Sequence, residues 1–235
     1  MRKLLLVLPF LMLGISAIAQ QVPLMEVEGQ SEISVLPDEA LIMVNLSQKA
    51  MKVADATNAL NRKTKDIQDA LKKTGVTGYE FTVDNYYVNV NRVYTKGTSR
   101  DSGYVASQNV KIRVKSTGKD LTTITETLHK SGEIGFHMQF VMSDALRKST
   151  ESKLLQLALE NAKQKAEVIA KTMQITSYKL HRVSYGSSGN GFIPVMRNAK
   201  MEMMAMSADM DQEPILIPEE QKLTDKVVVS FSFEM

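Results

Sequence analysis

Apolar and polar residues alternate in two runs near the start of the chain. Residues 25–35 form the first run and residues 40–46 form the second. A period of two places successive side chains on opposite faces of a strand, so each run predicts a half-buried strand. Pro37 and Asp38 lie between the runs and predict a corner, because proline fixes its backbone angle and aspartate bonds the nearby backbone.

Gly29 and Ser31 continue the apolar face of the first strand with almost no side chain. A glycine inside a strand often marks a place where another backbone approaches closely. We therefore expect a neighbouring element to pack tightly against the strand at this point.

Three segments have apolar residues at helical spacing: residues 53–71, which stop before Gly75, residues 121–130, and residues 144–173. Ser143 and Asp144 are suited to cap the third and longest helix. The stripe that we expect to be buried on it is Leu155, Ala158, Ala162, Ala166, Ile169 and Met173. Its alanines would let the helix lie close to a sheet.

Further strands are predicted at residues 81–94, 104–115, 133–142, 178–185 and 227–233, with a hairpin loop at 95–102 and an irregular segment at 186–213. The order ββα, ββα, βα, β predicts an α+β fold of mixed or antiparallel sheets, with one long and two shorter helices packed on them. The two ββα passes indicate two subdomains.

Residues 1–19 have the pattern of a secretory signal peptide. Arg2 and Lys3 precede an apolar run, and Ala17-Ile18-Ala19 is a small-x-small cleavage signal. A membrane anchor is the alternative, but the run is about 15 residues, short of the roughly 20 that a span needs. We expect export to the periplasm or cell envelope, with residues 20–235 as the mature domain and no transmembrane span in it.

Composition narrows the classes of function further. The chain has no cysteine, which excludes a lipidated form, disulfides and thiol chemistry. The formal net charge of +3 includes two charges in the signal peptide, so the mature chain is close to neutral. Nucleic-acid binding depends on neutralising phosphates with basic residues, so we expect no nucleic-acid partner.

Several motifs, in their order along the chain, resemble those of SIMPL-domain proteins, a family of unknown function numbered 541. They are Gly29-x-x-x-Ile33-x-Val35-x-Pro37-Asp38-x-Ala40, Gly103-Tyr104-x-Ala106, the helix at 158–170, and a closing strand after Pro214 and Pro218. The chain departs from the family at Pro218, which Glu219 follows where glycine is common. The resemblance implies an exported, non-catalytic α+β protein, a homo-oligomer with a structural or oxidative-stress role, and no catalytic residues or cofactor.

Asp38 and Glu39 are adjacent carboxylates, a residue type used in acid–base catalysis. Their position between two strands favours a structural corner over a catalytic pair.

Residues 196–210 contain six of the 15 methionines. Soft thioether sulfur suits Cu(I), which makes Met201, Met203, Met204 and Met206 candidate metal ligands. Exposed methionine also absorbs oxidants, so a metal or oxidant buffer is one alternative function. A partner-contacting segment is favoured, because methionine adapts to irregular apolar surfaces.

The other candidate chemistry is weaker. His129, His137 and His181 are scattered, whereas a zinc site gathers three or four ligands. The serines near Gly186 lack the Gly-x-Ser-x-Gly pattern of a nucleophile turn, which leaves an unrecognised hydrolase only as a further alternative.

Two surface features fall on the predicted hairpin at residues 81–115. Tyr86, Tyr87, Tyr94 and Tyr104 are expected to form a cross-strand aromatic ladder, with a ligand platform as the alternative. Lys111, Arg113 and Lys115 share the other face of their strand. We expect a solvated stripe there, with contact to an anionic envelope surface as the sharper alternative.

Overall fold

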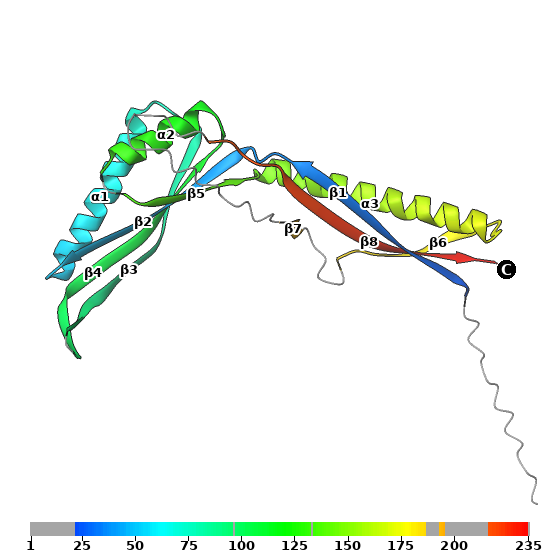
Figure 1. Ribbon diagram of the computed structural model, residues 1–235, viewed down its shortest axis with the longest axis horizontal. Helices are drawn as coiled ribbons and strands as arrows, with labels where there is room; N and C mark the ends of the chain where they lie inside the picture. Colours follow the sequence, from blue (N-terminus) through cyan, green and yellow to red (C-terminus); the bar gives the residue numbers. More distant parts are fainter. Residues whose placement is uncertain (1–21, 96, 133, 187–192, 196–215, 235) are drawn as a thin grey trace, which may run out of the picture.

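The computed structural model has an α+β fold, as predicted, and all its strand pairs are antiparallel (Figure 1). The structure describes residues 22–95, 97–132, 134–186, 193–195 and 216–234. In chain order the elements are β1 (Leu24–Val35), β2 (Glu39–Ala50), α1 (Val53–Lys73), β3 (Tyr79–Thr95), β4 (Thr98–Val114), α2 (Lys119–Lys130), β5 (Phe136–Val141), α3 (Asp144–Thr172), β6 (Tyr178–Ser184), β7 (Ile193–Val195) and β8 (Gln221–Phe233).

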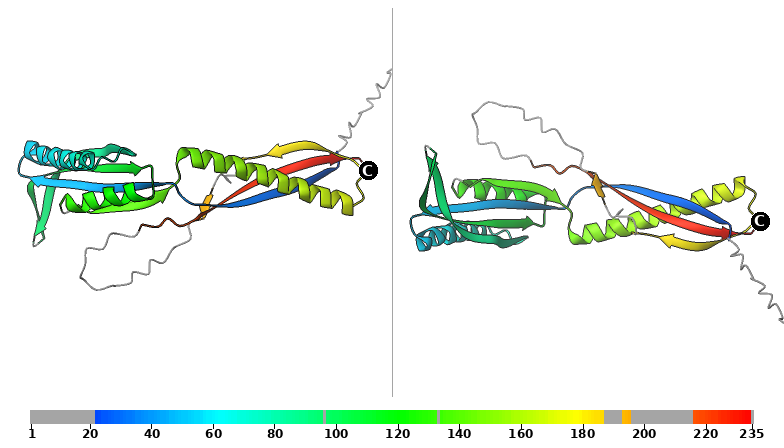
Figure 2. Two further views of the ribbon diagram at one scale, coloured as in Figure 1. Left: turned by 90° about the horizontal axis from the view of Figure 1, so that it is seen from above. Right: turned by 90° about the horizontal axis from the view of Figure 1, so that it is seen from below.

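Two lobes lie end to end, each with its own sheet (Figures 1 and 2). The insert lobe has the strand order β3-β4-β2-β5 and carries α1 and α2 on one face. The terminal lobe has the order β1-β8-β6, with β7 also pairing with β8, and carries α3. Two subdomains are therefore present, but they do not follow the two ββα passes, because β1 pairs with β8 instead of β2.

The core of the insert lobe lies between its sheet and two helices. On β2 the alternating residues Ala40, Ile42 and Val44 are fully buried. Leu60 on α1 and Leu121 on α2 are also fully buried and belong to the same cluster. The period-two and helical patterns of the sequence thus meet in one core.

In the terminal lobe α3 lies close to β1 at Gly29, as the small side chains predicted. A Cβ atom at Gly29 would overlap the carbonyl oxygen of Ala158 and lie 2.8 Å from the Cβ of Ala162. Next to it the Ser31 hydroxyl donates a hydrogen bond to the carbonyl oxygen of Leu154, at 2.8 Å. Helix and strand therefore approach to backbone contact.

The buried stripe of α3 differs from the prediction. The buried residues are Thr150, Leu154, Ala158, Ala162, Ala166 and Ala170. Leu155 is only half-buried, and the exposed fraction reaches 37% at Ile169 and 69% at Met173. Because a turn takes 3.6 residues, a repeat of four shifts the stripe by about 40° around the helix at each step. This matches the oblique path of α3 across the sheet (Figure 2).

β1 is an edge strand, and side chains of α3 bond its outer backbone groups. The Asn161 carboxamide oxygen accepts a hydrogen bond from the Gln30 N–H at 3.1 Å. The Lys165 ammonium group donates to the Glu28 carbonyl oxygen at 2.8 Å. The unpaired backbone groups of an exposed edge strand can pair with a strand of another molecule. Asn161 and Lys165 occupy such groups on β1, and we call these two residues the edge clamp.

Among the described residues, three segments of the chain lie at the junction between the lobes. The first joins β1 to β2, and the second joins β5 to α3. They are tied together because the Asp38 carboxylate accepts a hydrogen bond from the Ser143 N–H at 2.7 Å. Ser143 is the N-cap of α3, as predicted, and its hydroxyl accepts from the Leu146 N–H. The third leads into β8, where the Gln221 carboxamide donates to the Phe140 carbonyl oxygen at 3.4 Å.

β3 and β4 extend past the rest of their sheet as a hairpin arm (Figure 1). The predicted loop at 95–102 is wrong, because strand pairing continues to Thr95 and Thr98. Gly97 has a φ of 80°, which suits the tight turn that replaces the loop. Pairing of β4 with β2 ends at Tyr104 and Ala50, so beyond that point the arm is two-stranded.

Candidate functional site

Several sequence predictions lie outside the described residues. These are the signal peptide at residues 1–19 and the candidate copper ligands Met201, Met203, Met204 and Met206. The metal and oxidant hypotheses for residues 196–210 therefore stay predictions. Within the segment predicted to be irregular, residues 193–195 form the short strand β7.

Asp38 and Glu39 are engaged in separate structural contacts at the corner between β1 and β2. Asp38 accepts a hydrogen bond from the N–H of Ser143, the N-cap of α3, as described above. Glu39 is nearly buried, and its carboxylate lies 2.8 Å from the guanidinium of Arg113. That hydrogen bond raises the pKa of Arg113, while partial burial opposes the shift. The two carboxylates thus serve the corner that the sequence predicted.

The basic stripe on β4 is paired with acids of the same sheet. Lys111 forms an ion pair with Asp84, and Lys115 lies 2.8 Å from the Glu80 carboxylate. The mutual hydrogen bond lowers the pKa of Glu80 and raises the pKa of Lys115. With Arg113 held by Glu39, each base of the stripe has an acidic partner. The stripe is a neutralised, solvated face, which weakens the hypothesis that it binds an anionic surface.

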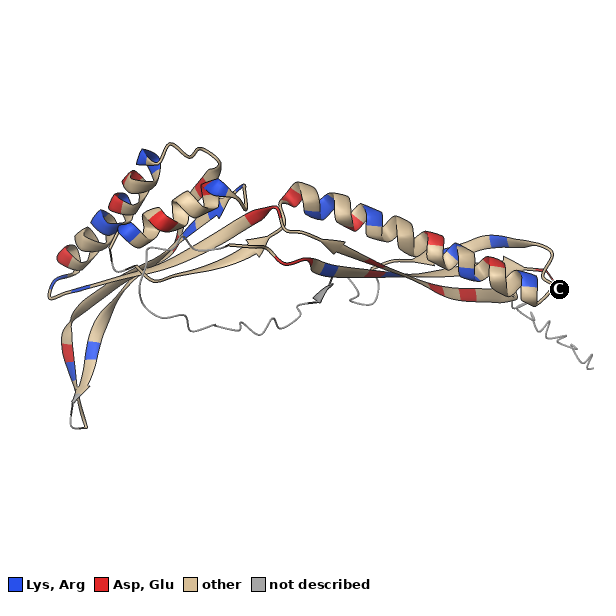
Figure 3. Ribbon diagram, turned by 45° about the horizontal axis from the view of Figure 1, so that its top comes forward, with Lys and Arg blue, Asp and Glu red and all other residues tan. Residues whose placement is uncertain are grey.

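The terminal lobe repeats this arrangement on the sheet face opposite α3. Lys222 lies 2.7 Å from Glu32, and Lys226 lies 3.3 Å from Glu28. Hydrogen bonds from Gln30 and then from Lys226 lower the pKa of Glu28. Figure 3 shows acidic and basic residues intermixed over both lobes. The face is a polar, solvated surface.

The histidines do not come together. The ring of His129 on α2 packs against Phe136, with 5.0 Å between ring centres. His137 lies on β5 and His181 on β6, in different sheets. Across the part of the chain that the structure describes, no group of three His, Asp or Glu side chains is placed to hold a metal ion.

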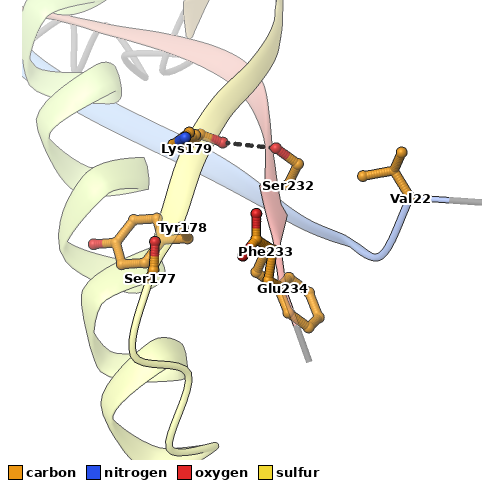
Figure 4. Close-up of a pocket in the computed structure, with 7 residues that line it drawn as sticks. All are labelled: Val22, Ser177, Tyr178, Lys179, Ser232, Phe233 and Glu234. Atoms are coloured by element: carbon orange, nitrogen blue, oxygen red, sulfur yellow. Dashed lines mark hydrogen bonds between the residues drawn. The ribbon is translucent and has the colours of Figure 1, made fainter.

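A shallow pocket of about 110 Å³ lies at the far end of the terminal-lobe sheet (Figure 4). Its lining residues are Val22, Ser177, Tyr178, Lys179, Ser232, Phe233 and Glu234. The Ser232 hydroxyl donates to the Lys179 backbone carbonyl at 3.5 Å. It is not held by a base, so the pocket lacks the nucleophile–base pair that covalent catalysis needs.

A tyrosine–aspartate pair under the start of α3 was not singled out from the sequence. Asp225 on β8 is buried, and its carboxylate accepts hydrogen bonds from the Tyr185 hydroxyl at 2.9 Å and the Lys226 N–H at 2.7 Å. Burial, and then the bond to Asp225, raise the pKa of Tyr185. The pair satisfies a buried carboxylate, which identifies it as a structural contact.

The tyrosines of the β3–β4 hairpin do not form the predicted ladder. The register pairs Tyr87 with Ser107, Tyr94 with Ser99 and Tyr104 with Val90, so no two of these tyrosines face each other across the strands. Tyr86 and Tyr87 are half exposed, and the exposed fraction of Tyr94 is 77%. The arm is therefore a candidate interaction surface.

A second candidate surface lies on β6, beside α3. Leu180 pairs with Phe231 and Val183 with Val229, and both partners belong to the core beneath α3. Directly paired residues point to the same face, yet the exposed fraction is 62% at Leu180 and 44% at Val183. α3 therefore leaves β6 uncovered. The sequence predicted a strand at residues 178–185 but not that its apolar face would be bare.

Comparison with protein families matches residues 25–231 to SIMPL, described as a protein of unknown function (DUF541). No curated protein matches the chain. No helix in the described ranges is long and apolar enough to cross a membrane. The family match covers most of the chain and both lobes, from β1 into β8. The chain therefore belongs to the SIMPL family.

Proposed function

We propose that this protein is an exported, non-catalytic component of the cell envelope that works as a homo-oligomer, with a structural or oxidative-stress role. The predicted signal peptide supports export. The ion-paired sheet faces and the shallow pocket support a role without chemistry, since the candidate carboxylates and histidines are separated or held in structural contacts. The observation that carries the oligomer is the bare apolar face of β6.

This face is extended by α3. Leu159 lies two residues from Asn161, which is about 200° around a helix. Since Asn161 faces β1, Leu159 faces the opposite flank, toward β6. Leu159, Leu180 and Val183 are exposed apolar residues on this side of the terminal lobe, and we call these three residues the β6 face. Exposed apolar patches of this kind mark protein–protein contacts.

A second copy of the chain is the partner that we propose for the β6 face. A two-fold interface joins the same patch on both subunits, so one apolar face at a sheet edge is sufficient. The other surfaces of the terminal-lobe sheet are less suited to such a contact. The edge clamp bonds the outer edge of β1, and the charges on the polar face of the sheet are paired with each other.

The test is the mass of the cleaved, untagged protein by light scattering after size exclusion, beside the variant L180E/V183E. Two charges on the β6 face should convert the oligomer to a monomer, because they would be buried unpaired. Val168→Glu is the matched control, since Val168 is exposed on the solvent side of α3 and lies outside the β6 face. A wild-type protein that is monomeric at micromolar concentration would overturn the proposal.

A further inference from the structure

The end of the hairpin arm has apolar side chains but no core. Residues 91–95 and 97–103 lie beyond the last pair between β4 and β2, so only two strands remain there. Two-stranded hairpins are marginally stable in water and need a partner for their apolar residues. Val93 and Tyr94 are both exposed on this segment. These exposed side chains are therefore suited to contact a surface outside the molecule.

The charge of the same segment is positive. Residues 91–103 contain three basic residues and one acid. The acid, Asp101, is already bound by Arg92 at 3.3 Å. Arg100 is exposed, lies opposite Val93 and has no ion pair with any described residue. The arm thus presents an uncompensated positive charge next to exposed apolar and phenolic groups.

An anionic bilayer surface fits this combination. Tyrosine favours the membrane–water interface, where its ring is in apolar surroundings and its hydroxyl is hydrated. Basic residues near an anionic leaflet are attracted to its phosphates. A second copy of the chain fits less well, because acids on the exposed sheet faces already have basic partners. Glu32 and Glu28 on β1 pair with Lys222 and Lys226, and Glu80 on β3 pairs with Lys115.

We propose that the arm docks on anionic phospholipid surfaces, with Val93 and Tyr94 in the headgroup region and Arg100 against the phosphates. The proposal does not depend on oligomerisation, because the arm lies on the insert lobe and the β6 face lies on the terminal lobe. A peripheral contact of this kind would hold the protein at the envelope without a membrane span.

The test is co-sedimentation of the full mature protein with vesicles. One set contains phosphatidylglycerol and phosphatidylcholine in equal parts, and the other contains phosphatidylcholine alone. The wild type should pellet with the anionic vesicles only, and added salt should release it because screening weakens surface electrostatics. V93S/Y94S and Arg100→Glu should each lose binding.

Matched controls distinguish the effect of the arm residues from the effect of losing any exposed apolar side chain or reversing any exposed charge. Val168→Ser removes an exposed apolar side chain on α3, and Arg62→Glu reverses an exposed charge on α1. Both should bind as the wild type does, and unchanged circular dichroism should show that all variants are folded. Wild-type protein that stays in the supernatant, or arm variants that pellet like wild type, would overturn the proposal. Light scattering of the same variants tests the oligomer separately.

Discussion

The Asp38 carboxylate and the Ser143 backbone N–H, 2.7 Å apart, join the two inner crossings between the lobes. The contact explains why an aspartate occupies the corner after Pro37. It also places the helix cap of α3 directly on the turn between β1 and β2, so the direction of the helix and the direction of the corner are fixed together.

Asp38→Ala should therefore destabilise the protein by about 1–2 kcal/mol, because it leaves the Ser143 N–H without its charged acceptor. Urea unfolding followed by circular dichroism measures the change. Asp66→Asn on the exposed surface of α1 is the control and should be nearly neutral. Equal stabilities of the two variants would show that the junction contact contributes nothing.

Gly29→Ala should be among the most damaging small substitutions. The added methyl group would overlap the Ala158 carbonyl, so α3 must move off the sheet, at a cost of about 2–3 kcal/mol. Gly135→Ala is the matched control, because no atom lies within 4 Å of a Cβ built there. Thermal melts of both variants measure the difference, and a stable Gly29→Ala protein would contradict the observed packing.

Removal of the edge clamp should expose β1 to other strands. N161A/K165A leaves the Gln30 N–H and the Glu28 carbonyl without their partners. We expect a loss of about 1 kcal/mol in stability and faster aggregation with a thioflavin signal, since open edges template pairing. Lys163→Ala, two residues from each and therefore on the opposite flank of α3, also removes an exposed side chain and should aggregate at the wild-type rate. No increase in aggregation for the double variant would argue against a protective role.

The Glu80–Lys115 pair predicts a pH dependence. The hydrogen bond from Lys115 holds the pKa of Glu80 below its ordinary value of 4.5. The pair's contribution is thus complete above that value and is lost as the pH falls through the lowered pKa. Glu80→Gln should melt slightly below wild type at neutral pH and converge with it in acid. Both side chains are about half exposed, so salt should also remove the difference. A gap that persists in acid would contradict this account.

Local patterns predicted much of the fold. The alternation of β1 and the cap at Ser143 depend on residues close in sequence, and both are present. The small residues at Gly29 and Ser31 predicted a close approach, and the structure shows that the partner is the distant helix α3. The stripe of α3 was predicted wrongly at Ile169 and Met173, because the angle at which a helix crosses a sheet is not encoded in its own sequence. The arm was shortened to a loop because polar residues at 95–102 gave no sign of strand pairing.

The candidate surfaces were harder to predict for a physical reason. A strand pattern shows which face is apolar, but whether a neighbouring element covers that face depends on tertiary packing. Leu180 and Val183 have the pattern of core residues and are exposed because α3 follows β1 and β8 instead. In the same way, the sequence showed the bases at Lys111 and Lys115 but not the acids that pair with them across strands.

The position of β8 affects the order in which the molecule assembles. β8 is the last strand in the chain and the middle strand of the terminal-lobe sheet, where it pairs with both β1 and β6. All strands of the insert lobe precede it, so that lobe can fold while the chain is still being delivered. β1 emerges early, but its inner edge stays unpaired until β8 follows, whereas α3 precedes β8 and can already bond the outer edge through Asn161 and Lys165.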